Sequence, residues 1–186
     1  MKMTKLIAAS LLLIGAAEMA AAQQPAVRYN YAELRYVDVD VAGGSGLQVG
    51  GSYRFDNNWF VLGSLTDIGF DASVDSTTIE LGGGYVFAWK PDWDLLASVR
   101  FVDVSVDTPF GDGDDDGLLV EAGTRGLLTP EFEVRGSVNH TTIGDGDTFL
   151  KIAGDYYFAE QFAAGLSLEF AGDVDVLSIG ARWFFE

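Results

Sequence analysis

The chain has no cysteine, only four prolines and a single histidine among its 186 residues. Without cysteine, no disulfide bond can stabilise the domain. Basic residues are also scarce, since 11 Lys and Arg stand against 28 Asp and Glu, for a net charge of −17. This balance argues against nucleic acid as a partner and against simple adhesion to anionic lipid, although it is compatible with loops that meet divalent cations. We expect no cofactor.

Long hydrophobic runs are absent except at the N-terminus. Residues 1–22 combine a basic start (Lys2, Lys5), an apolar run over 6–17 and small residues at 20–22. This pattern predicts a secretory signal peptide, which leaves residues 23–186 as one domain. An N-terminal membrane anchor is the alternative, but the apolar run is short for a bilayer crossing. Gly, Asp or Arg interrupts every later apolar stretch.

What the chain has in quantity is glycine and aromatic residues, with 23 Gly, 13 Phe and 7 Tyr, a composition that favours β-sheet over long helices. The last ten residues are the clearest example. Leu177, Ile179 and Trp183 share one face of an extended chain, whereas Ser178 and Arg182 share the other. A strand that is apolar on one face and small or charged on the other is typical of a bilayer-spanning β-strand.

Two kinds of connection alternate along the chain. One kind carries Asn, Asp or Pro between apolar, mostly aromatic shoulders, and the other is rich in Asp and Gly without aromatic rims. Short aromatic turns at one end and longer acidic loops at the other are typical of an up-and-down barrel in an asymmetric membrane. The aromatic turns are 55–59, 89–93, 128–132 and 158–162, and the acidic connections are 38–45, 69–76, 103–117, 144–147 and 172–175.

Ten strands are predicted between these connections, and each is roughly long enough for a tilted crossing of the bilayer. The even number places both chain ends on the side of the short turns, which would be the periplasm. An eight-stranded barrel is the alternative if 59–69 or 94–104 pairs differently. The predicted strands are 28–38, 46–55, 59–69, 77–88, 94–104, 117–128, 132–142, 148–158, 162–171 and 175–185.

Alternation of side chains supports this fold. In most segments, large apolar residues occupy one parity and small or charged residues the other, which predicts an all-β, antiparallel transmembrane barrel with apolar residues outside. The segment 59–69 is ambiguous, because Phe60 and Leu62 compete with Trp59 and Val61. The alternatives are a soluble β-sandwich and a soluble lipid-carrying barrel whose apolar face turns inward.

Both signs of charge are predicted to point into the barrel. Inside a narrow barrel each charge needs a partner or water, because an unpaired buried ion is very costly. We therefore expect a salt-bridge network that closes most of the lumen, as side chains fill small barrels. A narrow passive pore is the alternative, although a selectivity ring would favour one sign. The inward charges are Glu33, Arg35, Arg54, Glu80, Arg100, Glu121, Arg125, Glu133, Arg135, Lys151, Asp155, Glu169 and Arg182.

The segment 111–117 resembles half of a calcium loop. Its spacing of Asp112, Asp114, Asp116 and Gly117 matches D-x-D-x-D-G, but position 123, where that motif needs a bidentate Glu, holds Gly123. We interpret the segment as a solvated hairpin loop kept extended by its like charges. The alternative is weak divalent-cation binding by Asp112, Asp114, Asp115 and Asp116.

The single histidine, His140, is the only histidine base available for nucleophile chemistry. Its parity and that of Thr142 place both on the lipid face, where outer-membrane lipid A deacylases carry a His-x-Ser pair. Thr replaces Ser here, and no acidic partner stands at a known spacing. We therefore expect an interfacial histidine and no enzyme, with a lipid-modifying enzyme as the alternative.

Five segments together carry a family resemblance: the signal peptide, 29–33 (YNYAE), 121–125 (EAGTR), 128–132 (LTPEF) and 180–185 (GARWFF). In these segments the chain resembles the small outer-membrane β-barrels of Gram-negative bacteria, grouped as OmpA-like or opacity-type "porin family" proteins, and within them a subgroup linked to quorum-sensing signals. The resemblance implies an outer-membrane location, contact with lipid and lipopolysaccharide, and insertion by the barrel-insertion machinery. Glu186 departs from the pattern, since such chains commonly end on Phe.

These observations lead to one functional expectation and two alternatives. We expect a structural or interaction role at the cell envelope, with a largely closed polar lumen and acidic extracellular loops that contact lipopolysaccharide or cations. A narrow passive porin for small solutes and a lipid-modifying enzyme are the alternatives.

Overall fold

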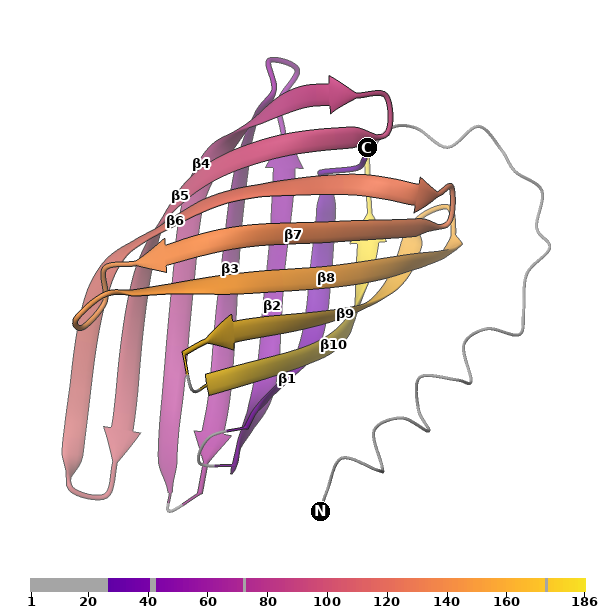
Figure 1. The fold of residues 1–186 in the computed structure, drawn as a ribbon. Coiled ribbons are helices and arrows are strands. Elements are labelled where there is room, and N and C mark those ends of the chain that lie inside the picture. Colours follow the sequence, from indigo (N-terminus) through magenta and orange to yellow (C-terminus); the bar gives the residue numbers. More distant parts are fainter. Residues whose placement is uncertain (1–26, 41–42, 72, 173) are drawn as a thin grey trace.

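The computed structural model describes residues 27–40, 43–71, 73–172 and 174–186, so the predicted signal peptide lies outside the described residues. Ten antiparallel strands form a closed barrel in which β1 pairs with both β2 and β10 (Figure 1). The predicted ten-stranded barrel is confirmed, and the eight-stranded alternative is wrong. The strands are β1 Tyr31–Val39, β2 Gly44–Arg54, β3 Trp59–Phe70, β4 Val74–Lys90, β5 Trp93–Thr108, β6 Gly111–Thr129, β7 Phe132–Thr141, β8 Asp147–Ala159, β9 Phe162–Ala171 and β10 Val174–Phe184.

The outer surface of the barrel is apolar. Leu81, Leu47 and Ile179 are among many large hydrophobic side chains that are at least half exposed there. In β3, Trp59 and Val61 point outward and Phe60 is buried inside, which settles the ambiguous segment. Since the apolar face is outside and the sheet is closed, the soluble sandwich and the lipid-carrying barrel are both wrong.

The connections differ from the prediction at one end of the barrel. The end with turns between β2 and β3, β4 and β5, β6 and β7, and β8 and β9 is called here the aromatic end. Its turns match the predicted ones, and rings such as Trp59 and Tyr85 meet edge to face at 5.2 Å beside them. At the opposite end, called here the hairpin end, the strands continue into the predicted acidic loops. The predicted loop 103–117 is replaced by a two-residue turn at Pro109 and Phe110.

The β5–β6 hairpin therefore extends the barrel wall on one side (Figure 1). Residues 111–118 of β6 pair with β5 alone, because pairing with β7 begins only at Leu119. In this extension the alternation inverts, since Val104 and Val106 have the inward parity and Asp103 and Asp107 the outward one. Above the apolar band the outer face meets water, so carboxylates replace large apolar residues there.

The hydrophobic core lies at the aromatic end of the barrel. Val27, Tyr29, Phe60 and Val86 form one buried cluster, and Tyr157, Ala163 and Phe184 form a second. The segment 27–30 thus precedes β1 and packs into the lumen, which corrects the predicted strand start at residue 28. None of the described residues forms a helix long and apolar enough to cross a membrane.

Candidate functional site

The structure places the thirteen predicted inward charges in three groups. Arg54 stands apart near the aromatic end, where its guanidinium lies 5.3 Å from the Tyr29 ring centroid and hydrogen-bonds Asn58. The other twelve are ion-paired at two levels. The inner cluster is one connected network of Glu33, Arg35, Arg125, Glu133, Arg135, Asp155 and Arg182. The name outer cluster is used here for the triad Glu80, Arg100 and Glu121 together with the separate pair Lys151 and Glu169, which line the same cavity.

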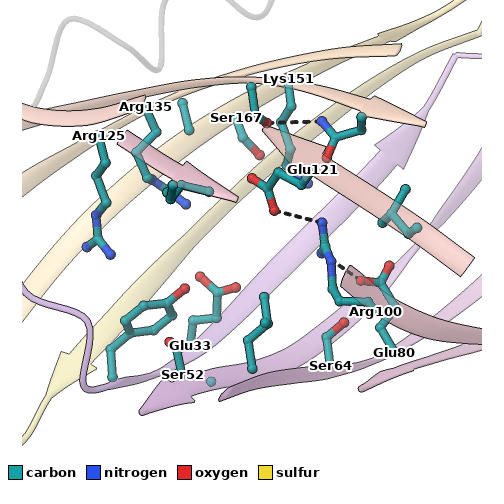
Figure 2. Close-up of a pocket in the computed structure, with 18 of the residues that line it drawn as sticks. Glu33, Ser52, Ser64, Glu80, Arg100, Glu121, Arg125, Arg135, Lys151 and Ser167 are labelled. Carbon is teal, nitrogen blue, oxygen red and sulfur yellow. Dashed lines mark hydrogen bonds and ion pairs between the residues drawn. The ribbon is translucent and has the colours of Figure 1, made fainter. Parts of the chain in front are cut away.

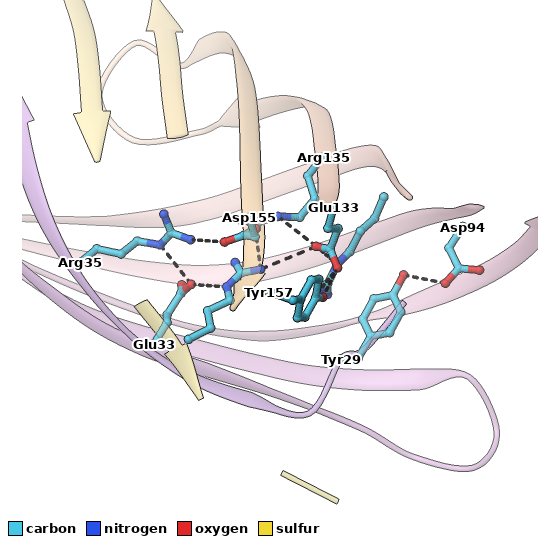
Figure 3. Close-up of polar contacts among 10 residues, drawn as sticks. Tyr29, Glu33, Arg35, Asp94, Glu133, Arg135, Asp155 and Tyr157 are labelled. Atoms are coloured by element: carbon cyan, nitrogen blue, oxygen red, sulfur yellow. Dashed lines mark hydrogen bonds and ion pairs between the residues drawn. The ribbon is translucent and has the colours of Figure 1, made fainter. Parts of the chain in front are cut away.

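Arg182 on β10 stands directly opposite Glu33 on β1, at the seam where the barrel closes. Figure 3 shows Glu33, Arg35 and Asp155 of the inner cluster close together. The Nε of Arg182 lies 2.8 Å from Glu33, and its Nη1 lies 3.2 Å from Asp155 on β8. Glu33 also pairs with Arg35 at 3.0 Å. The side chain of Arg182 is 2% exposed, so this guanidinium depends on protein carboxylates and not on water for compensation.

Glu133 is the most buried member of the inner cluster, with no exposed surface. It accepts two hydrogen bonds from Arg125, at 2.6 and 3.1 Å, in the bidentate arrangement typical of Arg–carboxylate pairs. Tyr157 donates a third hydrogen bond at 2.6 Å. The carboxylate is therefore saturated by charged and polar donors, as its burial requires.

The ion pairs between β6, β7 and β8 run diagonally across the strands. Arg125 stands directly opposite Arg135, and Glu133 stands directly opposite Asp155, so the direct neighbours repel. These four charges are instead paired across diagonals, as in Arg125 with Glu133 and in Arg135 with Asp155 at 2.9 Å. These like-charge neighbours are tolerated because the barrel brings three further charges, Glu33, Arg35 and Arg182, to the same place.

Several lumen residues escaped the sequence analysis. Tyr29 donates a hydrogen bond to Asp94 at 3.1 Å, and burial raises the pKa of Tyr29 above its usual range, so it remains a donor. The Arg182 guanidinium lies 4.3 Å from the Tyr31 ring centroid, a cation–π contact. The inward orientation of Asp94 and Tyr157 could have been predicted from alternation. Asp94 has the parity of Arg100 on β5, and Tyr157 has the parity of Asp155 on β8.

The outer cluster lines a cavity of about 160 Å³ together with members of the inner cluster. Arg100 bridges Glu80 at 2.8 Å and Glu121 at 2.9 Å (Figure 2). Lys151 pairs with Glu169 at 3.0 Å, and this pair is the most exposed of the lumen. Charged side chains of both clusters thus line the cavity.

The aspartates for which divalent-cation binding was the alternative do not surround a common point. Asp112, Asp114, Asp115 and Asp116 lie along the extended strand β6, and all are exposed. Extended residues advance about 3.3 Å each, and neighbours point to opposite faces, so four ligands cannot converge. Over the ranges that the structure describes, no group of three or more His, Asp or Glu side chains is arranged to hold a metal ion.

His140 lies on the outer face of β7 at the hairpin end, as its parity predicted. Its Nδ1 contacts the Thr148 hydroxyl at 2.9 Å. The hydroxyl of Thr142 accepts a hydrogen bond from the backbone N–H of Leu118, also at 2.9 Å. His140 and Thr142 are thus engaged with different partners.

A closed barrel with an apolar exterior and a charged interior defines an integral membrane β-barrel, because only closed sheets satisfy their backbone groups in lipid. Comparison with known families agrees. The family described as "outer membrane protein beta-barrel domain" matches residues 6–170, and the chain belongs to this family. The expected outer-membrane location is confirmed.

Several solved membrane barrels share the fold of this chain at low sequence identity. No curated protein sequence matches the chain. The KdgM porin has a TM-score of 0.55 at 9% identity, with 84% of this chain and 99% of that chain covered. The NanC porin has a TM-score of 0.54 at 7% identity, covering 83% and 100%. The β domain of the Bordetella autotransporter BrkA has a TM-score of 0.53 at 14% identity, covering 83% and 98%. At these identities the likeness shows the fold alone.

Proposed function

We propose that this protein is a structural and interaction barrel of the outer membrane whose lumen is closed to solutes. The observation that carries the proposal is the inner cluster, in which Glu133, Asp155 and Arg182 are each at most 2% exposed. Its members come from β1, β6, β7, β8 and β10, on both sides of the lumen. A passage through this layer would leave buried ions without partners.

The aromatic end supplies a second barrier to passage. Val27 and Tyr29 pack against Phe60 and Val86 inside the barrel, so an apolar layer lies beside the ionic one. Arg28 adds a hydrogen bond to the carbonyl of Glu160 and keeps the segment 27–30 against the turn between β8 and β9. The apolar side chains of this cluster offer no hydrogen-bond partners to water or polar solutes.

We further propose that the hairpin end faces the outside of the cell and makes the contacts of the protein there. The β5–β6 hairpin projects beyond its neighbours and carries a fully exposed phenyl ring, Phe110, at its tip. Carboxylates such as Asp103 and Asp116 border the apolar band, where phosphates of lipopolysaccharide would need bridging divalent cations to approach. The expected partners are outer-membrane lipid, lipopolysaccharide and, during assembly, the barrel-insertion machinery.

The second candidate is a narrow passive porin, favoured by the fold shared with the KdgM and NanC porins. The rate at which protein-containing liposomes swell in solutions of small sugars distinguishes a closed barrel from a passive porin. We expect the wild type to swell no faster than liposomes without protein. The double variant Arg125→Ala/Glu133→Ala removes one cation and the anion that pairs with it, so the net charge of the inner cluster is unchanged. Liposomes that contain this variant should swell faster with the smallest sugar.

The matched control is Lys151→Ala/Glu169→Ala, which removes an equally balanced pair from the more exposed outer cluster and should leave swelling at the wild-type rate. Wild-type swelling that slows with increasing sugar size would overturn the closed lumen and support the porin.

We also propose that the barrel is not a lipid-modifying enzyme. His140 and Thr142 would have to act as base and nucleophile, yet each is engaged with a separate partner. Lipid A mass after incubation with wild type and with His140→Ala is expected to be unchanged in both. A mass loss of one acyl chain with the wild type alone would establish catalysis.

A further inference from the structure

The outer part of β6 has a free edge. Residues 111–118 pair with β5 on one side, and pairing with β7 on the other side begins only at Leu119. The connection between β7 and β8 reaches β6 as far as Asp115, whose carboxylate accepts a hydrogen bond from the backbone N–H of Gly144 at 2.9 Å. Figure 1 shows the β5–β6 hairpin running on past this connection. A free strand edge presents backbone groups to which another extended chain can bind.

The contacts of Leu118 show which backbone groups point to this edge. Its N–H donates to the hydroxyl of Thr142 at 2.9 Å, and its C=O accepts from the backbone N–H of Thr142, also at 2.9 Å. Alternate residues of a strand direct their backbone groups to the same side, so those of Asp112 and Asp114 face the edge too. In the part of the chain that the structure describes, no strand pairs with them there.

The outer face beside the edge is strongly acidic. Asp112 and Asp114 are exposed, and Asp107 of β5 stands directly opposite Asp112. The segment 103–117 holds six aspartates and no Lys or Arg. Like charges directly opposite each other are destabilising, and cationic side chains on an added strand would relieve this repulsion. A second copy of the chain would add its own aspartates instead, so pairing of two barrels at this edge is disfavoured.

The inner face beside the edge has room for apolar side chains. Val106 of β5 stands directly opposite Gly113, and Val104 has the same inward parity. A Cβ added at Gly111 or Gly113 would meet nothing within 4 Å. An apolar side chain on an added strand can therefore reach across the glycines toward the valines. The segment that fits both faces alternates cationic and apolar residues.

We propose that the free edge of β6 binds an extended, cationic segment of another protein by antiparallel strand addition. In an antiparallel pair, the residues that bond to Asp112 and Asp114 stand directly opposite them and point their side chains to the same face. Those residues are Lys or Arg, and the residues between them are apolar. This binding mode rests on the proposed contact role of the hairpin end, and it is independent of whether the lumen conducts.

Isothermal titration calorimetry of the purified barrel in zwitterionic detergent micelles tests the edge, with an end-capped peptide of alternating lysine and valine as the probe. We expect saturable one-to-one binding by the wild type. Two N-methylated forms of equal charge are the matched probes. Methyl groups on the lysine backbone nitrogens remove the donors that face β6 and should weaken binding at least tenfold. Methyl groups on the valine nitrogens face away and should leave the affinity within threefold.

Variants of the barrel test the same edge from the other side. Asp114→Pro removes one carboxylate and the N–H that faces the edge, where proline is tolerated, and should weaken binding at least tenfold. Asp114→Ala removes the carboxylate alone and should weaken binding about threefold, as for one exposed ion pair. Asp75→Ala removes a carboxylate from β4, which is paired on both sides at this position, and should leave the affinity within twofold. Where Asp114→Pro does not fold, the two methylated peptides decide on the wild type.

Absence of saturable binding, equal binding of the two methylated peptides, or equal affinities of Asp114→Pro and Asp114→Ala would each overturn strand addition. The orientation of the hairpin end has a separate test, because the chain has no cysteine. Phe110→Cys at the fully exposed tip should react on intact cells with a polyethylene-glycol maleimide too large to cross the outer membrane. Labelling only after lysis would contradict the proposed orientation, whereas peptide binding in micelles would be unaffected.

Discussion

Glu133 is the residue on which the charged interior depends most. It is fully buried and joins Arg125 to Tyr157, while Arg135 and Arg182 lie within 3.9 Å of it. Breaking a buried ion pair from one side leaves the partner charge uncompensated, which costs more than the pair itself contributes. The stability of variants at this position therefore shows whether the interior depends on ion pairs or only on neutral hydrogen bonds.

We expect Glu133→Gln to lower the free energy of unfolding by about 3–5 kcal/mol, because Arg125 loses its countercharge in a buried place. Glu169→Gln breaks the half-exposed pair with Lys151 and should cost at most about 1 kcal/mol. Urea unfolding in lipid vesicles measures both. Equal losses for the two variants would contradict the assignment of Glu133 to a buried ionic cluster.

Gly84 shows how closely the wall of the lumen is packed. A Cβ at this position would overlap the carbonyl oxygen of Ala97 and lie 2.6 Å from the Phe60 ring. We expect Gly84→Ala to lower the free energy of unfolding by about 1–3 kcal/mol through overpacking.

The control for this prediction is Gly136→Ala on β7, where an added Cβ meets nothing within 4 Å. It should be neutral or stabilise by up to about 1 kcal/mol, because alanine has less chain entropy to lose. The two midpoints in the same urea titration provide the check, and a loss at Gly136 as large as at Gly84 would refute the packing argument.

At the scale of the strand, β10 carries the contrast between lipid and lumen most clearly. Ile179 points outward from its middle, between Tyr36 and Leu166 on the neighbouring strands, whereas Asp175 lies near the hairpin end. A cation at the centre of a bilayer costs about 2–4 kcal/mol in membrane barrels, and the cost falls to about 0–1 kcal/mol near the interface.

Ile179→Arg is therefore expected to lose about 2–4 kcal/mol in vesicles, and Asp175→Arg at most about 1 kcal/mol. Refolding equilibria in urea with phosphatidylcholine vesicles give both values. If Ile179→Arg were tolerated as well as Asp175→Arg, the outer face of β10 would not lie against lipid.

The element scale also shows what the sequence could and could not predict. The two alternating kinds of connection predicted the number of strands. Period-two alternation predicted the inward side of the thirteen charges, because lipid and lumen impose opposite demands on neighbouring residues. It failed at 103–117, where Val104 and Asp103 have exchanged faces above the apolar band. A prediction that expects apolar residues outside interprets such an acidic strand as a loop.

The partners of the lumen charges were beyond sequence reasoning for a different reason. The residue directly opposite Arg125 is Arg135, and the ion-pair partner of Arg125 is Glu133, two positions away along β7. Which residues stand on such a diagonal depends on the stagger between β6 and β7. Stagger and barrel closure are set by all ten strands together. The aromatic lining of the lumen was missed because tyrosine is also typical of the aromatic girdle on the outer face of membrane barrels. Tyr29 and Tyr157 lie inside the lumen instead.

At the scale of the whole molecule, the barrel has three layers along its axis. An apolar cluster at the aromatic end is followed by the inner ion-pair cluster, and the cavity with its outer cluster opens toward the hairpin end. From these layers we propose an outer-membrane barrel that is closed from the inner cluster to the aromatic end.

The current through single barrels in a planar lipid bilayer tests that claim most directly. We expect that insertion of the wild type produces no steady conductance steps in 1 M KCl, whereas Arg125→Ala/Glu133→Ala produces small ones. Persistent, ohmic steps from the wild type, of the same size from one insertion to the next, would contradict it.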